Sequence, residues 1–359
     1  MSGDLALYLG LLIFSFLVAV VAVVPFINLL YRLRLTRRKS VAEKAKGGKW
    51  GKLTSGLQLF ERMHDWKVGT PVGGGVLVIG VVTILFALLF PLASSLGLYV
   101  NTAFPIREEL NIIFFTFLSF GALGLYDDLY KFFGKPAGGT LGKRFGLSIK
   151  VKFGLQWVLA LVVAGMLYQN LKVDFFHIPL WEGVVNLGVW YVPVAALVIV
   201  AFCNAVNFTD GLDGLAGGLL MICLFAFWVI AAQVLDTVLS VFISLWIGTL
   251  MAFLYFNVFP ARFYMGDAGA LAFGATLAVV GLLTGKIFAL VVIGGLFVVE
   301  AASSLVQIVG IRVFERRVFK IAPAHHLLEA IGWEEPKIVM RAWLAGIMLA
   351  VLGMWLAVI

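Results

Sequence analysis

Cysteine, charge and internal repeats are all scarce in this chain of 359 residues. Its two cysteines, Cys203 and Cys223, both lie in apolar stretches, so we expect two packing residues and no disulfide. Only 13% of the residues are charged, whereas 62% are hydrophobic, and a soluble protein of this length could bury a core with far less apolar sequence. The composition therefore excludes a soluble globular protein and indicates an integral membrane protein.

Apolar runs long enough to span a bilayer as helices recur along the whole sequence. The first run is too long for a cleaved signal peptide, and no small-residue cleavage pattern follows it, so we expect it to be retained. The sequence predicts an all-α, polytopic membrane protein with about ten transmembrane helices, in a single domain over residues 1–359. The expected spans are 5–31, 72–96, 110–125, 153–168, 189–202, 215–232, 238–256, 268–283, 287–309 and 338–358.

Basic residues gather in the connections on one side of the expected membrane. Of the 27 lysines and arginines, 24 lie in segments 32–67, 131–152 and 312–341 or at Arg262, and the other side keeps only Arg107, Lys172 and Lys286. The positive-inside rule then places the N-terminus outside and the basic segments in the cytoplasm. The net charge of +8 is therefore attributed to orientation and to attraction of anionic lipids and substrates, not to nucleic-acid binding.

Two connections have a composition of their own. The basic stretch 32–52 is interpreted as a solvated loop. Segment 170–188, on the opposite side, alternates in a way that predicts a small hairpin.

The stretch CNAVNFTDGLDGLAGG, at 203–218, places Asn204, Asn207, Asp210 and Asp213 at every third position between two apolar spans. Threefold spacing brings such side chains to one face of a helical turn, while the intervening glycines permit a bend and close backbone approach. Carboxylates near hydrocarbon are costly and tend to be paired, metal-bound or functional. We interpret the stretch as one wall of a polar site at the depth of the membrane surface.

Other polar groups fall on the same expected cytoplasmic face. They are Asp127 and Asp128 in GLYDDLYK, Asn257 and Asp267 in YFNVFPARFYMGDAGA, and His325, His326 and Glu329 in KIAPAHHLLEAIGW. Loop ends are often polar only because they contact water, but that explanation accounts poorly for five aspartates that lie beside glycines and lysines at span ends.

The residue types at this face favour phosphoryl transfer. Several aspartate oxygens without cysteine indicate a hard cation, Mg²⁺ or Mn²⁺, rather than zinc. Lys67, Lys131 and Lys152 are candidates to hold phosphate oxygens, and the histidine pair is a candidate for phosphate binding or acid–base chemistry. Positioning and charge neutralisation do most of the catalysis in phosphoryl transfer. A site at the bilayer surface suits one lipid-borne and one soluble substrate.

The motifs YDDLYK, NAVNFTDGLDGLA, FNVFPARFYMGDAGAL and APAHHLLEAIGW together resemble those of the polyprenyl-phosphate N-acetylhexosamine-1-phosphate transferase superfamily. KVGTPVGGG, at 67–75, and GGLFVVE, at 294–300, resemble two further motifs, so the resemblance extends from about residue 67 to residue 343. It is nearest to the branch whose donor is UDP-MurNAc-pentapeptide. It implies transfer of phospho-MurNAc-pentapeptide to undecaprenyl phosphate in the bacterial inner membrane, giving lipid I and UMP, with Mg²⁺ as cofactor and a homodimer as the assembly.

The resemblance also implies roles for individual residues. Asp267 resembles the Mg²⁺ ligand, and Asp127 and Asp128 resemble the pair nearest the lipid phosphate, of which one is base or nucleophile. The remaining matches are with the wall that meets the nucleotide-sugar (Asn204, Asn207, Asp210 and Asp213), with further essential positions (Asn257 and His325) and with the basic positions (Lys67, Lys131 and Lys152). Glu300 is expected to help kink the ninth helix or to make a polar core contact.

Some positions depart from the superfamily pattern. Leu327 follows two histidines where a third is usual, Val72 and Gly73 replace Thr-Met, and the loop 135–146 is spaced differently. These departures bear on recognition of the pentapeptide more than on metal chemistry. A sister transferase that uses UDP-N-acetylglucosamine or another UDP-N-acetylhexosamine is one alternative. A membrane transporter is a second, although transporters place ionisable groups near the bilayer midplane and often show repeats.

Overall fold

The computed structural model describes residues 2–37, 65–95, 100–133, 147–179 and 184–359. The interpretation of the basic stretch as a solvated loop concerns mainly residues 38–52, and the unusual loop spacing concerns residues 135–146. Both lie outside the described residues.

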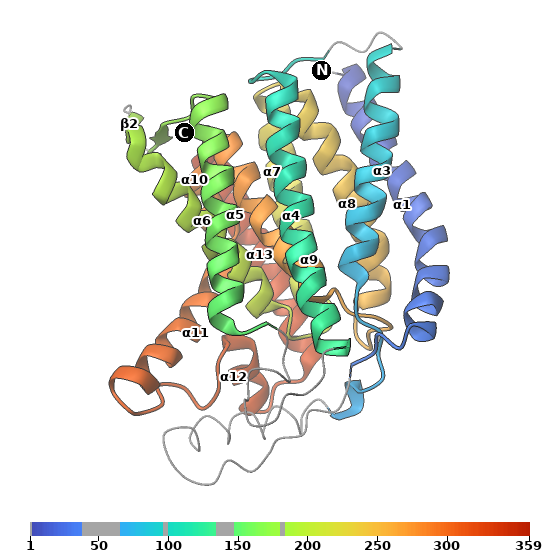
Figure 1. Cartoon of the computed structure of the whole chain (residues 1–359), viewed down its shortest axis with the longest axis vertical. Coiled ribbons are helices and arrows are strands. Elements are labelled where there is room, and N and C mark those ends of the chain that lie inside the picture. The colour runs from blue at the N-terminus through green and yellow to red at the C-terminus, as the bar shows by residue number, and fades with distance from the viewer. Residues whose placement is uncertain (1, 38–64, 96–99, 134–146, 180–183) are drawn as a thin grey trace.

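Helices make up nearly all of the described chain (Figure 1). The long helices are α1 (Ser2–Arg32), α3 (Gly74–Ser95), α4 (Ile106–Phe133), α5 (Ile149–Asn170), α6 (Tyr191–Thr209), α7 (Leu215–Gln233), α8 (Thr237–Asn257), α9 (Gly266–Leu283), α11 (Gly295–Val313) and α13 (Glu335–Val358). The short ones are η1 (Asp65–Lys67), η3 (Gly188–Trp190), α10 (Ile287–Ile293) and α12 (Ala324–Ala330). Strands β1 (Phe175–His177) and β2 (Val184–Asn186) pair antiparallel, so the small hairpin is confirmed.

Ten of these helices are long and apolar enough to cross a membrane. They correspond one by one to the predicted spans, which confirms an all-α, polytopic membrane protein. Both chain ends lie at the same end of the bundle, the upper end in Figure 1, as an even number of crossings requires. The hairpin lies at that end too, whereas η1 and α12 lie at the opposite end.

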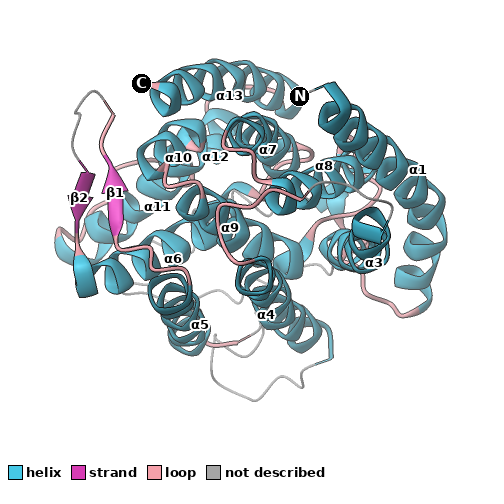
Figure 2. Ribbon diagram, turned by 90° about the horizontal axis from the view of Figure 1, so that it is seen from above, coloured by secondary structure: helices cyan, strands magenta, loops and turns pink. Residues whose placement is uncertain are grey.

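Helices α8 and α9 form the centre of the bundle. Both are apolar on every face, and a helix of that kind is stable only when other helices surround it. Helix α9 packs between α4 and α6 (Figure 2). Phe117 from α4, Phe242 and Trp246 from α8, and Phe273 from α9 meet in a buried aromatic cluster.

The ninth predicted span, 287–309, is wrong as a single helix, because α10 ends at Ile293 and α11 begins at Gly295. At Gly294 a Cβ atom would lie 2.6 Å from Phe202 Cε1 and 3.0 Å from the Leu290 carbonyl oxygen. Glycine is thus required where the chain passes α6. Beyond the break α11 runs obliquely toward the end of the bundle that carries α12 (Figure 1).

Candidate active site

The predicted polar residues gather where α4 ends and α9 begins, and one glycine contact makes this possible. A Cβ atom on Gly124 would lie 2.1 Å from the carbonyl oxygen of Asp267, so only glycine lets the two helices approach so closely. Residues 127 and 128 lie one helical turn further along α4. They are therefore carried to the first turn of α9.

Five side chains form an acid–lysine cluster at this junction, comprising Asp127, Asp128, Lys131, Lys152 and Asp267. The ammonium nitrogen of Lys131 lies 3.1 Å from Asp127 Oδ2, 3.6 Å from Asp128 Oδ1 and 2.9 Å from Asp267 Oδ1. Lys152, from the first turn of α5, lies 3.0 Å from Asp127 Oδ2 and also donates a hydrogen bond to Asp267 Oδ2. The two lysines therefore hold three carboxylates from two helices together.

The adjacent aspartates of the acid–lysine cluster have different partners. Asp127 faces both lysines, and its Oδ1 accepts a hydrogen bond of 2.6 Å from the backbone N–H of Leu147. Asp128 Oδ2 accepts one of 3.1 Å from the backbone N–H of Ala268, in the first turn of α9. Asp128 thus holds the start of the helix that carries Asp267, whereas Asp127 is aimed at the cations.

The donor set of the acid–lysine cluster fits Mg²⁺ bound through one or two carboxylates. Three aspartates face two lysines, which leaves one formal negative charge, and all the acidic ligand atoms are hard oxygens. Within the described residues, no three His, Cys, Asp or Glu side chains are spaced to hold a metal ion by themselves. Mg²⁺ usually takes one or two carboxylates and completes its shell with water and substrate phosphate. The cluster therefore fits an ion that substrate helps to hold.

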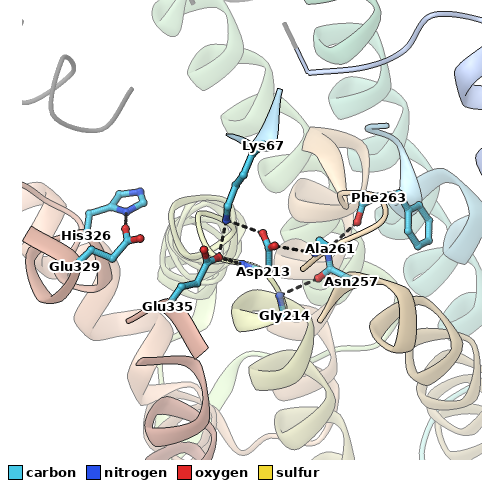
Figure 3. Close-up of polar contacts among 9 residues, drawn as sticks. All are labelled: Lys67, Asp213, Gly214, Asn257, Ala261, Phe263, His326, Glu329 and Glu335. Carbon is cyan, nitrogen blue, oxygen red and sulfur yellow. Dashed lines mark hydrogen bonds and ion pairs between the residues drawn. The ribbon is translucent and has the colours of Figure 1, made fainter. Parts of the chain in front are cut away.

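A second group, the Lys67 node, consists of Lys67, Asp213, Glu335 and Asn257 (Figure 3). The Lys67 ammonium lies 2.6 Å from Asp213 Oδ1 and 2.5 Å from Glu335 Oε1, and the three side chains are buried. Asn257 accepts a hydrogen bond from the Gly214 N–H and donates one to the Phe263 carbonyl oxygen. Since both carboxylates already pair with Lys67, its predicted contact with a phosphate stays a prediction.

The histidine pair, His325 and His326, lies beside the loop between α6 and α7. His325 Nδ1 lies 2.9 Å from Glu300 Oε2, and His326 Nδ1 lies 2.6 Å from Glu329 Oε2. A Cβ atom on Gly211 would lie 2.3 Å from His325 Nε2, so the imidazole packs directly on this glycine. With Nδ1–H donated to Glu300, His325 presents Nε2 as a proton acceptor toward the loop.

The remaining predicted residues lie along α6 and the loop that follows it. Asn204 donates hydrogen bonds to Gln156 Oε1 and to the Val200 carbonyl oxygen, both of 2.8 Å. Asn207 lies one turn further on and is partly exposed. Asp210 follows the last turn of α6. Asn204, Asn207 and Asp210 therefore follow one another along α6 and its C-terminal end, toward the Lys67 node.

Asp210 has an unusual protonation equilibrium. Burial is the main cause that raises the pKa of its carboxyl, and the nearby carboxylates of Asp267, Asp128 and Asp213 add to the rise while Lys67 opposes it; these effects together place the pKa at about 7. A pKa raised in the folded state means that this group's contribution to stability is present at low pH. That contribution is lost as the pH rises through 7.

Asp210→Asn should therefore raise the thermal midpoint of the solubilised protein at about pH 8, by about 3 °C, and raise it clearly less at about pH 5. The amide keeps the shape but carries no charge to ionise. Intrinsic fluorescence melts at the two pH values measure this, with the exposed Glu334→Gln as the control. A midpoint that rises equally at both pH values would contradict the raised pKa.

Glu335 lies at the Lys67 node although the sequence pattern did not single it out, whereas Glu300 was expected to have one of two roles. Glu335 contacts Lys67, which lies 268 positions away in the chain. An acidic residue opening an apolar helix just before Pro336 was the available signal. Glu300 makes the polar contact that was one of its two expected roles, and its partner is His325.

Comparisons with known proteins agree with these motifs. A family model described as glycosyl transferase family 4 matches residues 110–285. Three relatives are each named phospho-N-acetylmuramoyl-pentapeptide-transferase. The one from Chloroflexus aurantiacus is 36% identical over 87% of this chain and 86% of its own length. The one from Aquifex aeolicus is 38% identical over 81% of this chain and 80% of its own length. The one from a Geobacillus species is 31% identical over 97% of this chain and 97% of its own length.

The fold and the site together define a multi-pass membrane protein with a carboxylate–lysine site at one end of its transmembrane helices. The chain belongs to the family of phospho-N-acetylmuramoyl-pentapeptide transferases. Membership of this family excludes the transporter alternative. The single domain over residues 1–359 stays a prediction.

Proposed function

We propose that this chain is a multi-pass enzyme of the bacterial inner membrane that transfers phospho-MurNAc-pentapeptide from UDP-MurNAc-pentapeptide to undecaprenyl phosphate. The products are lipid I and UMP. An oxygen of the lipid phosphate forms a bond to the phosphorus that carries the sugar, and the bond from that phosphorus to UMP breaks. One pyrophosphate linkage is replaced by another.

The observation that carries the proposal is the acid–lysine cluster at the ends of α4, α5 and α9. Its two ammonium groups lie within 3.1 Å of Asp127 Oδ2, where they can also neutralise the oxygens of two phosphates. A phosphate held by the two lysines would lie beside Asp127, because Asp127 faces both of them. Asp127 is therefore the group best placed to take the remaining proton of the lipid phosphate. Phosphoryl transfer depends on such fixed positive charge.

Asp267, together with Asp127 or Asp128, would hold Mg²⁺ when the ion is bound. The ion supplies additional positive charge to the phosphate oxygens. Asp128 keeps Asp267 in place through its hydrogen bond to the first turn of α9. Lys131 and Lys152 would neutralise the remaining negative charge on the phosphate oxygens.

The donor is proposed to lie on the other side of the site, against Asn204, Asn207, Asp210 and Asp213, with Asn257, His325 and His326 nearby. This assignment rests on the motif positions and on the way the loop after α6 lies between the acid–lysine cluster, the Lys67 node and the histidine pair. His325, oriented by Glu300, presents a nitrogen acceptor to a hydroxyl of the donor.

The function is tested by UMP release from purified protein in detergent. Multiple-turnover UMP release should occur only when UDP-MurNAc-pentapeptide, undecaprenyl phosphate and Mg²⁺ are all present, and chelation should stop it. Release of many equivalents of UMP per protein without the lipid acceptor, or no release with all three components, would contradict the proposal.

The N-terminus is proposed to lie outside the cell and the active site at the cytoplasmic face, because α1, α4 and α11 lead into the basic segments from the site's end of the bundle (Figure 1). Lys320→Cys, at the site's end, and Lys172→Cys, beside the hairpin, introduce exposed thiols at opposite ends. A membrane-impermeant thiol reagent should label residue 172 in intact cells and residue 320 only in inverted vesicles. The native Cys203 and Cys223 are buried, so the unmodified protein is the control. Labelling of residue 320 from outside would reverse the orientation.

A homodimer is proposed on the family resemblance. Mass measurement of the protein in nanodiscs, which gives the number of chains per particle, tests this independently of activity.

A further inference from the structure

The loop between α6 and α7 is held at its far end by α13. The backbone N–H of Asp213 donates a hydrogen bond of 2.6 Å to Glu335 Oε1, and the Trp343 indole N–H donates one of 3.2 Å to the carbonyl oxygen of Gly214. Gly214 has a φ of +81°, which glycine adopts without strain. Buried backbone groups need such partners, so the shape of this turn depends on α13.

Glu335 connects this turn to a third part of the chain. The same Oε1 atom that accepts from Asp213 also pairs with the Lys67 ammonium at 2.5 Å. Lys67 in turn pairs with Asp213 Oδ1, and Asp213 Oδ2 accepts a hydrogen bond of 2.9 Å from the Ala261 N–H. The carboxylates of Glu335 and Asp213 together therefore tie η1, the loop after α6, the segment before α9 and the start of α13 to one another (Figure 3).

The residues just before Asp213 lie against the histidine pair and at the end of α6. Gly211 packs against His325 Nε2, and Asp210, directly before it, is the C-cap of α6. A turn that loosened at Asp213 and Gly214 would shift both residues. Glu335 does not contact the acid–lysine cluster through any interaction of the described residues, and that cluster is held by its own lysines and by Ala268.

We propose that Glu335 is a positioning residue for the donor: by holding Lys67 and the turn at Asp213, it keeps the loop after α6 in the conformation that binds the UDP-linked sugar. The inference rests on the proposed function for the identity of the donor. The acceptor phosphate, assigned to the acid–lysine cluster, does not depend on it. Loss of Glu335 should therefore weaken donor binding selectively.

A merely structural role would give a different result. A buried charge that loses its partner, here the Lys67 ammonium, destabilises the fold. A variant that is partly unfolded has a lower apparent kcat, because fewer molecules are active. Its KM values for donor and acceptor would both stay unchanged. The separation of KM from kcat, and of donor from acceptor, thus distinguishes the two roles.

The test compares Glu335→Gln with Glu334→Gln, its exposed neighbour and matched control. Glu335→Gln should raise the donor KM at least about tenfold, equivalent to about 1.4 kcal/mol, and leave the acceptor KM within about twofold. Glu334→Gln should match the unmodified protein in both. Unchanged KM values, whether or not kcat falls, or an equal rise in both KM values, would overturn the proposal.

If Glu335→Gln does not yield folded protein, Glu335→Asp keeps the charge but is too short to reach both Lys67 and the Asp213 N–H, and the same criteria apply. Calorimetric titration with UMP separates this proposal from the proposed function, because UMP binding needs no turnover. UMP affinity that falls in the variant supports the positioning role even if the preferred sugar differs. Equal UMP affinity in variant and unmodified protein contradicts it.

Discussion

Asp267→Asn should lower kcat by about 10²–10³-fold while the protein still folds in detergent. Asp267 lies in the first turn of α9 and contacts Lys131 and Lys152. The amide keeps the side-chain shape but loses the charge that would hold Mg²⁺ and that now balances the two lysines. Initial rates of UMP release across a Mg²⁺ titration measure the effect, and the Mg²⁺ concentration for half-maximal rate should rise.

Asp174→Asn, at the opposite end of the bundle, is the matched control and should leave kcat and the Mg²⁺ titration unchanged. The thermal midpoint of each variant shows whether the fold is intact. A well-folded Asp267→Asn protein with nearly normal turnover would contradict the assignment of Asp267 as the metal ligand.

Asp127→Asn and Asp128→Asn should both lower turnover, but unequally. Adjacent helical residues point about 100° apart, and here Asp127 faces the two lysines whereas Asp128 holds the Ala268 N–H. Loss of the Asp127 charge should cost about 10²–10³-fold in kcat. An asparagine at position 128 keeps an oxygen acceptor for the Ala268 N–H, so the cost there should be about tenfold.

The two variants should also respond differently to conditions. If Asp127 takes the proton of the lipid phosphate, Asp127→Asn should recover partly as the pH rises above about 6, where a phosphate monoester loses its second proton. Asp128→Asn, which loosens the start of α9, should recover partly at higher Mg²⁺. Identical responses to pH and Mg²⁺ would show that the two aspartates share one role. A phospho-sugar trapped covalently on Asp127 without the acceptor would replace direct displacement with a two-step route.

Hydrophobic runs in the sequence were sufficient to predict the ten membrane-crossing helices. Length and apolarity alone define a crossing, whatever the helices pack against. The break at Gly294 could not be predicted in the same way. The break depends on Phe202 from α6, a neighbour more than ninety positions away in the chain. A Gly pair within an apolar run is equally compatible with an uninterrupted helix.

The acid–lysine cluster was predictable in composition but not in pairing. Motif positions placed Asp127, Asp128 and Asp267 at the same face, and the contact of Gly124 with the Asp267 carbonyl explains why they meet. Lys67 had been assigned to phosphate on its charge alone. Its pairing with Asp213 and Glu335 joins residues 146 and 268 positions away, and no local pattern marks such partners.

The donor remains the feature on which the account depends most, since sister transferases of the same superfamily use UDP-N-acetylglucosamine. A single reaction should contain UDP-MurNAc-pentapeptide and UDP-N-acetylglucosamine at equal concentration, with undecaprenyl phosphate and Mg²⁺. The mass spectrum of the lipid product should show undecaprenyl-pyrophosphoryl-MurNAc-pentapeptide and UMP as the coproduct. A lipid product carrying N-acetylglucosamine instead would contradict the account.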